Sequence, residues 1–256
     1  MNEGQSAFVL LYFIYLLVAS ITSNTCIALP LRLLTTFAHE FSHAASCWLT
    51  GGSVHQIEVY SNAGGVTRYR GGCRCLISSA GFLGEALWGM FFVVMSGGRK
   101  TATAAAVVLI SCLLLSLCYS PNKTMVILVI FYSISTFAVI WIEWYVYTPL
   151  IHYIILYFGV FMSFIAVTDI WEHTVVRASP GSDAYALHEE YDGCPCCLPR
   201  CIGFTWLICA LLLQISAFIL DYMLLSKECE DQGWLECIFD TRVDFSDWRW
   251  DGSLFN

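Results

Sequence analysis

The sequence predicts an all-α, polytopic integral membrane protein with about seven transmembrane helices and one small β-hairpin. Of its 256 residues, 58% are hydrophobic and only 12% are charged, about half the charged fraction of an average soluble domain. The apolar residues fall into runs long enough to cross a lipid bilayer as helices. Aromatic residues make up 15% of the chain, which suits the two interfaces of a membrane. The sequence contains no basic patch of the kind that would indicate a nucleic-acid partner.

Seven apolar runs have the length of a transmembrane helix, about 20 residues. Pro30 can open the second helix in its first turn, and Gly51-Gly52 can close it. The first run lacks the basic residues and the small-residue exit of a signal peptide, so we expect it to be a retained helix. The seven expected helices cover roughly residues 6–24, 29–49, 76–96, 102–119, 124–147, 151–176 and 203–226.

Two segments between these runs have a structure of their own. Valine, isoleucine and tyrosine residues between glycine pairs predict a β-hairpin over about residues 53–72, directly after the second helix. The cysteine-bearing loop 177–202 contains "SPGSDAYALHEEYDG", which predicts one short helix capped by Ser182 or Asp183. The expected organisation is a membrane-embedded domain over residues 1–226, with the hairpin as an insert, and an acidic C-terminal tail over residues 227–256.

Basic residues near the helix ends predict the orientation of the chain. With seven spans, the side of the N-terminus receives more of the Lys and Arg residues next to the membrane, which favours a cytosolic N-terminus. A juxtamembrane cysteine cluster before the last run is a candidate for S-acylation, with inert thiols or a metal site as alternatives. The cluster consists of Cys194, Cys196, Cys197 and Cys201. We expect a multi-pass protein of the endomembranes (ER or Golgi) or of the plasma membrane.

The second apolar run contains His39-Glu40-Phe41-Ser42-His43, an H-E-x-x-H pattern in an otherwise almost uncharged stretch. On a helix, residues i and i+4 share a face, so both imidazoles can ligate one Zn²⁺ ion. Glu40 would lie beside the metal and take a proton from water. Ionisable residues at membrane depth are rare and usually functional. The pattern therefore predicts a zinc site with His39 and His43 as ligands and Glu40 as the catalytic base.

A catalytic zinc ion needs about three protein ligands, and the third must come from another segment. We choose Asp169 because its expected depth in the membrane matches that of the histidines. Asp169 lies eight residues before Arg177, about 12 Å along a helix, and His43 lies eight residues before Gly51. Asp183 is the alternative third ligand and requires its loop to fold back. Asp169 could instead have a structural role, as a carboxylate at a helix end that pairs with His173 one turn further along. The other residues that we considered for this position are His55, Glu85 and Glu143.

Together these residues resemble the site-2 protease class of intramembrane zinc metallopeptidases, and most closely its peptidase-fifty-B-like branch. The resemblance rests on "FAHEFSHAASCWLTGGSVHQIEVYSNAGGVTRYRGG", "ISSAGFLGEALWG", "TDIWEHTV" and "GSDAYAL" and covers roughly residues 28–95 and 160–190. It implies Zn²⁺ as the cofactor, His39 and His43 as ligands, Glu40 as the catalytic acid/base, and membrane protein substrates. Well-characterised members supply the third ligand from an L-D-G-type motif. In this chain "TDI" and "SDA" are the nearest counterparts.

The sequence thus predicts an intramembrane zinc metallopeptidase that uses metal-activated water to hydrolyse peptide bonds of membrane-spanning or membrane-proximal substrates. Two alternatives remain. A catalytically inactive, metal-binding adaptor of the same family would keep the histidines, and an ion-conducting transporter would use the intramembrane carboxylates as a path. Zinc stoichiometry separates the transporter from the other two. Loss of cleavage with zinc retained in Glu40→Gln separates the peptidase from the adaptor.

Overall fold

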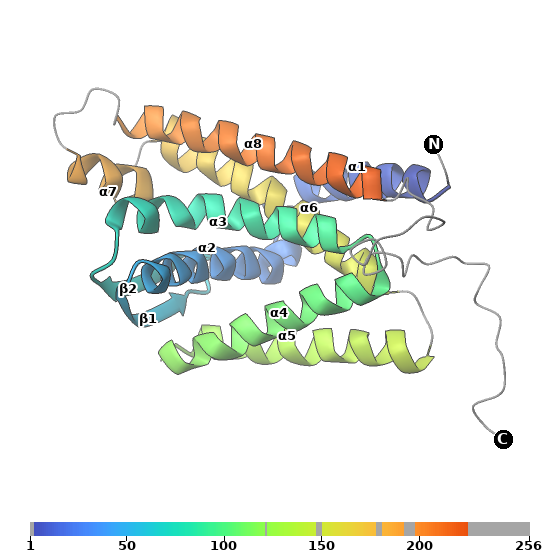
Figure 1. Cartoon of the computed structure of the whole chain (residues 1–256). Coiled ribbons are helices and arrows are strands. Elements are labelled where there is room, and N and C mark those ends of the chain that lie inside the picture. Colours follow the sequence, from blue (N-terminus) through green and yellow to red (C-terminus); the bar gives the residue numbers. More distant parts are fainter. Residues whose placement is uncertain (1–2, 121, 147–149, 178–180, 192–197, 225–256) are drawn as a thin grey trace, which may run out of the picture.

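The computed structural model describes residues 3–120, 122–146, 150–177, 181–191 and 198–224, which form a bundle of helices with a β-hairpin at one end (Figure 1). The fold class predicted from the sequence is confirmed. The long helices are α1 (Glu3–Thr22), α2 (Leu29–Leu49), α3 (Arg74–Met95), α4 (Arg99–Ser116), α5 (Lys123–Trp141), α6 (Ile151–Asp169) and α8 (Pro199–Leu224). The shorter elements are α7 (Asp183–Glu190), the π-helices Ile142–Val146 and Ile170–Val176, and the 3-10 turns Cys26–Ala28 and Leu117–Tyr119.

Helices occupy all seven predicted positions, but fewer than seven candidate membrane spans result from them. Among the described residues, five helices are long and apolar enough to span a bilayer by themselves. α1 and α2 pass the same test only as a pair, and they are bent by 115° at the break between them. The number of candidate spans is therefore five, or six with the broken pair. The difference arises because an apolar run reports the length of a helix and not the direction in which the next helix leaves it.

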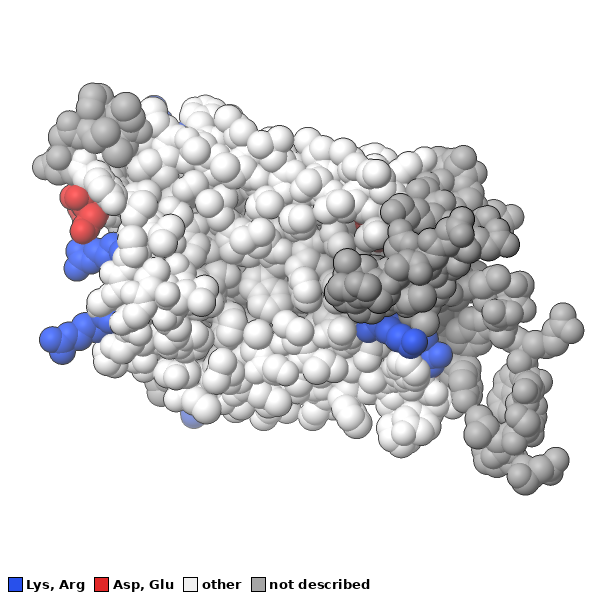
Figure 2. Space-filling view, in the orientation of Figure 1, with Lys and Arg blue, Asp and Glu red and all other residues white. Residues whose placement is uncertain are grey.

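The face of the bundle seen in Figure 2 is apolar along its middle and charged at its ends. In Figure 2, the basic and acidic side chains gather at the two ends of the long axis, and the broad band between them on this face is almost uncharged. On α5, Ile127, Ile134 and Phe137 are each more than half exposed and lie on one helical face. Such a band is the surface that a membrane protein presents to the hydrocarbon core of the bilayer.

The two ends of the bundle carry different parts of the chain. The hairpin and α7 lie at one end, whereas α1 begins and α8 ends at the other (Figure 1). The sequence-based prediction of seven crossings had put the N-terminus and the hairpin on the same side. In the structure, the start of α1 lies at the end opposite the hairpin instead (Figure 1). Arg68, Arg70 and Arg74 at the hairpin end still favour a cytosolic position for that end.

α3 lies at the centre of the bundle and packs against α2, α6 and α8. Its contact with α6 is a close approach of two backbones. A Cβ atom on Gly89 would lie 2.9 Å from the backbone nitrogen of Ser163, and one on Gly159 would lie 2.7 Å from the backbone nitrogen of Val93. Small residues permit this kind of packing between membrane helices. The helix that packs against α2 is therefore itself packed closely against α6.

The predicted β-hairpin consists of β1 (Ser53–Val59) and β2 (Gly65–Arg70), which pair in antiparallel register from Ser53 opposite Arg70 to Val59 opposite Gly65. Val54 and Ile57 of β1 are buried in a cluster with Ala44 of α2. The hydroxyl of Thr36, also on α2, donates to the backbone carbonyl of Ala63 in the turn at 3.0 Å. These contacts hold the hairpin along the helix that carries the H-E-x-x-H pattern.

Part of the predicted organisation falls outside the described residues. The acidic tail 227–256 lies there, and so do Cys194, Cys196 and Cys197 of the cysteine cluster. Cys201, the fourth member, is exposed in the first turns of α8. S-acylation of the cluster stays a prediction.

Candidate metal centre

His39 and His43 lie one turn apart on α2, and their imidazole rings meet. The two Nε2 atoms are 3.1 Å apart. The carboxylate of Asp183 lies against both rings, with Oδ2 at 3.0 Å from Nε2 of His39 and Oδ1 at 3.4 Å from Nε2 of His43. One ligand atom from each of the three residues lies within 4.8 Å of the others. Two imidazoles and one carboxylate are the donor set of a catalytic zinc site with three protein ligands.

Asp183 reaches the histidines because α7 folds back against the bundle. The helix begins as the sequence predicted, with the side-chain oxygen of Ser182 accepting a hydrogen bond from the backbone N–H of Tyr185 at 3.4 Å. Ala184 and Leu187 of α7 are buried in a cluster with Phe82 of α3. At the other end of α7, Glu190 accepts a hydrogen bond from Arg74 at 2.8 Å. The first residue of α7 is thereby held over α2.

The charge of Asp183 follows from this position. Burial by itself would raise the pKa of the carboxyl, but the neighbouring imidazoles of His43 and His39 outweigh that effect. They hold the pKa of Asp183 well below its ordinary value. The side chain is therefore an anion that faces two ring nitrogens.

α3 provides a cradle for the two rings. A Cβ atom on Gly81 would collide with the imidazoles of both histidines, so no larger residue fits there without a shift. The backbone carbonyl of Ile77 lies 2.6 Å from Nδ1 of His43 and accepts the proton of that nitrogen in the neutral ring. Nε2 of His43 then carries a lone pair that points at another nitrogen and at a carboxylate. Because acceptors that face one another repel, this arrangement fits a cation between them.

Glu40 lies beside this group without belonging to it. Its side chain is buried and turns toward the hairpin, where a Cβ atom on Gly65 would meet it. The hydroxyl of Thr67 in β2 lies 2.7 Å from Oε2 of Glu40 and 2.9 Å from its backbone carbonyl oxygen, so it can donate to either. The hairpin therefore determines where this carboxylate points.

The structure separates the residues considered for the third position. Asp183, the alternative in the sequence analysis, lies with the histidines, whereas Asp169 is not in this group among the described residues. Asp169 ends α6, and its charged neighbours include His173, Arg32 and His39. Its expected depth rested on position along the helix axis, which does not fix the direction in which a side chain points.

The other three candidates have different surroundings. His55 is exposed on β1. Glu143 is buried and accepts hydrogen bonds from the backbone N–H groups of Leu150 and Ile151 at 2.5 and 3.2 Å, so it caps the start of α6. Glu85 alone lies near the histidines, with Oε2 at 3.7 Å from Nδ1 of His39. Sequence reasoning did not find Thr67, because nothing in its local sequence links it to a residue 27 positions earlier.

A groove of about 630 Å³ runs beside this centre between α2 and α3 and reaches α4. It is lined mostly by apolar and small side chains, and Ser42, next to His43 in the chain, forms part of its wall. A Cβ atom on Gly84 would collide with Ser42, so the two helices are in close contact between the groove and the histidines.

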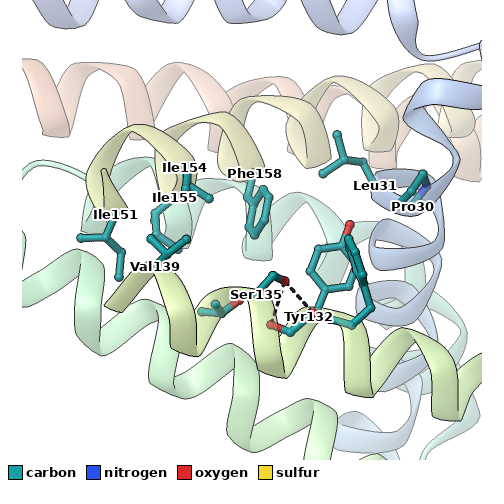
Figure 3. A pocket seen from close by; sticks show the side chains of 11 residues that line it. Pro30, Leu31, Tyr132, Ser135, Val139, Ile151, Ile154, Ile155 and Phe158 are labelled. Atoms are coloured by element: carbon teal, nitrogen blue, oxygen red, sulfur yellow. Dashed lines mark hydrogen bonds between the residues drawn. The ribbon is translucent and has the colours of Figure 1, made fainter. Parts of the chain in front are cut away.

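A second cavity, of about 280 Å³, lies away from the histidines between the start of α2, α5 and α6 (Figure 3). Leu31, Ile155 and Phe158 point into it. Ser135 also lines it, but its hydroxyl bonds to the carbonyls of Phe131 and Tyr132 in its own helix. The lining of this cavity is mostly apolar, and it includes none of the carboxylates or histidines considered for the metal site.

One of three comparisons with known proteins gives a match. Neither a curated protein nor a solved structure matches the chain at a significant level. The sequence model of one family, described as Peptidase M50B-like, matches residues 11–217, which include α2, the hairpin, α3 and α7. The chain therefore belongs to the Peptidase M50B-like family.

Proposed function

We propose that this protein is an intramembrane zinc metallopeptidase that hydrolyses peptide bonds of membrane-spanning or membrane-proximal substrates. In this proposal, His39, His43 and Asp183 hold the zinc ion. The observation that carries the proposal is the convergence of two Nε2 atoms and one carboxylate, with a separate buried carboxylate, Glu40, beside them. Membership of a peptidase family supports the same conclusion.

In this proposal, the residues around the ion have different roles. A bound zinc ion supplies a Lewis acid that acidifies water and polarises a peptide carbonyl. Glu40 is free of the ligand group and is the base that accepts a proton from water and later returns it to the leaving amine. Thr67 orients Glu40 through its hydroxyl at 2.7 Å. Asp183 supplies a negative charge, which lowers the cost of a divalent cation in a low-dielectric site.

The positions of the hairpin and the groove support this proposal. A membrane helix has all its backbone groups paired, so a substrate must unwind locally before a peptide bond is exposed. We propose that the unwound segment pairs with the edge of the hairpin, since β2 contacts Glu40 through Gly65 and Thr67. The apolar groove between α2 and α3 would receive the part of the substrate that remains in the bilayer.

The test uses the purified full-length protein in detergent and in proteoliposomes that contain single-span membrane proteins. Wild type should carry one zinc ion per chain by elemental mass spectrometry, and new peptide termini should appear in the vesicles. Glu40→Gln should retain the zinc ion and lower the cleavage rate by about 10²–10⁴-fold, because the general base is lost. The matched control is Glu58→Gln, which alters a buried carboxylate of β1 that accepts a hydrogen bond from Tyr60.

The outcomes separate the alternatives. Zinc in wild type without cleavage that depends on Glu40 would favour the inactive adaptor. A wild-type protein that binds no zinc would contradict both the peptidase and the adaptor, and would leave the transporter.

A further inference from the structure

Each of the two histidines turns its Nδ1 atom toward α3. For His43 the partner is the backbone carbonyl of Ile77, at 2.6 Å. For His39 it is the carboxylate of Glu85, with Oε2 at 3.7 Å from Nδ1. Ile77 and Glu85 lie two turns apart on α3, one on each side of Gly81. One helix thus offers an acceptor to the Nδ1 atom of both rings, while both Nε2 atoms face Asp183.

Glu85 is costly where it lies. Glu85 lies in a candidate membrane span and is only 2% exposed to solvent. Its Oε1 atom has no hydrogen-bond partner in the described part of the chain. A carboxyl group buried in this way destabilises a protein unless it has a partner. The nearest ion-pairing group recorded for it is His39. At this distance, which is longer than a hydrogen bond, the carboxyl group of Glu85 faces the ring of His39 without bonding to it directly.

We propose that Glu85 is a positioning residue for His39. Its carboxylate favours the tautomer with the proton on Nδ1, so that the lone pair stays on Nε2, the atom that faces Asp183. Residues that accept the second N–H of a metal-binding histidine orient the ring and raise its basicity. Glu85 also contributes a second negative charge near the ion, in addition to Asp183. This role rests on the proposed function, because it presupposes that His39 binds a metal ion.

The experiment measures zinc affinity of the full-length protein in detergent by competition with a chromophoric chelator. Glu85→Leu removes the charge and the acceptor at nearly constant volume, and it should weaken zinc binding by about 10–100-fold. Glu85→Gln keeps an oxygen acceptor without the charge, so its affinity should lie between those of wild type and Glu85→Leu. In ¹⁵N-histidine NMR spectra of the zinc-bound protein, the Nδ1–H proton of His39 should be protected from exchange with water in wild type and should exchange faster in Glu85→Leu.

Glu143→Gln is the control, because Glu143 is a second buried carboxyl group of the bundle but caps α6. It should leave zinc affinity unchanged even if it lowers thermal stability. The inference is overturned if Glu85→Leu binds zinc as tightly as wild type, or if Glu85→Gln is as weak as Glu85→Leu. A wild type without zinc would instead overturn the proposed function, so the two failures are distinguishable.

Discussion

At the scale of single residues, the H-E-x-x-H pattern separates two imidazoles from a carboxylate through helix geometry alone. His39 and His43 lie on one face of α2, and Glu40, one residue further round the helix, turns to the hairpin instead. The histidines then need partners that the pattern does not contain. Asp183, the carbonyl of Ile77 and the missing side chain of Gly81 provide them.

The identity of the third ligand is the residue-scale prediction. Asp183→Ala should abolish tight zinc binding, because it removes the anion at 3.0 Å from Nε2 of His39. Asp169→Ala should leave the zinc content near one ion per chain, because Asp169 is not in the ligand group among the described residues. Elemental analysis of both purified variants checks this. Zinc lost from Asp169→Ala and retained in Asp183→Ala would reverse the assignment.

At the scale of elements, α7 determines whether the site is complete. The helix has only eight residues, too few to be stable in isolation, so its place depends on packing against α3 and α8. The apolar contacts are buried, whereas the ion pair between Arg74 and Glu190 is 69% and 40% exposed on the two sides. An exposed pair contributes less than about 1 kcal/mol.

A pair of substitutions tests which contact holds α7. Leu187→Ala should cost about 2–5 kcal/mol of packing, loosen α7 and weaken zinc binding, because Leu187 is buried beside Phe82. Arg74→Ala should change zinc affinity by no more than a few-fold, since it removes only the exposed ion pair. Chelator competition measures both variants, and circular dichroism confirms that the bundle is folded. The opposite ranking would make the ion pair the contact that positions Asp183.

At the scale of the whole molecule, the break between α1 and α2 changes the topology. If the pair crosses the membrane once, the chain makes six crossings, and α1 begins on the same side as α8 ends (Figure 1). Seven crossings would put these two ends on opposite sides. The hairpin and α7, which begins with Asp183, lie at the other end of the bundle (Figure 1).

Reporter fusions check this topology. A reporter before residue 3 and a reporter after residue 224 should give the same, non-cytosolic signal, because the basic residues of the hairpin end favour the cytosol. A reporter inserted at Gly64 in the hairpin turn should give the cytosolic signal. Signals of opposite sign from the two ends of the chain would restore the odd number of crossings.

The sequence by itself determined the membrane fold, the hairpin after the second helix, the short capped helix in the loop, and the shared face of His39 and His43. Each of these depends on residues a few positions apart, and the periods of helix and strand fix such relations locally.

Only the tertiary structure decided that α1 and α2 form one broken pair, that Asp183 rather than Asp169 lies against the histidines, and that Thr67 and Glu85 accompany them. These relations join residues up to 144 positions apart. They depend on the angle at which one helix leaves another and on the path of a loop, which the packing of the whole bundle sets and no local pattern encodes.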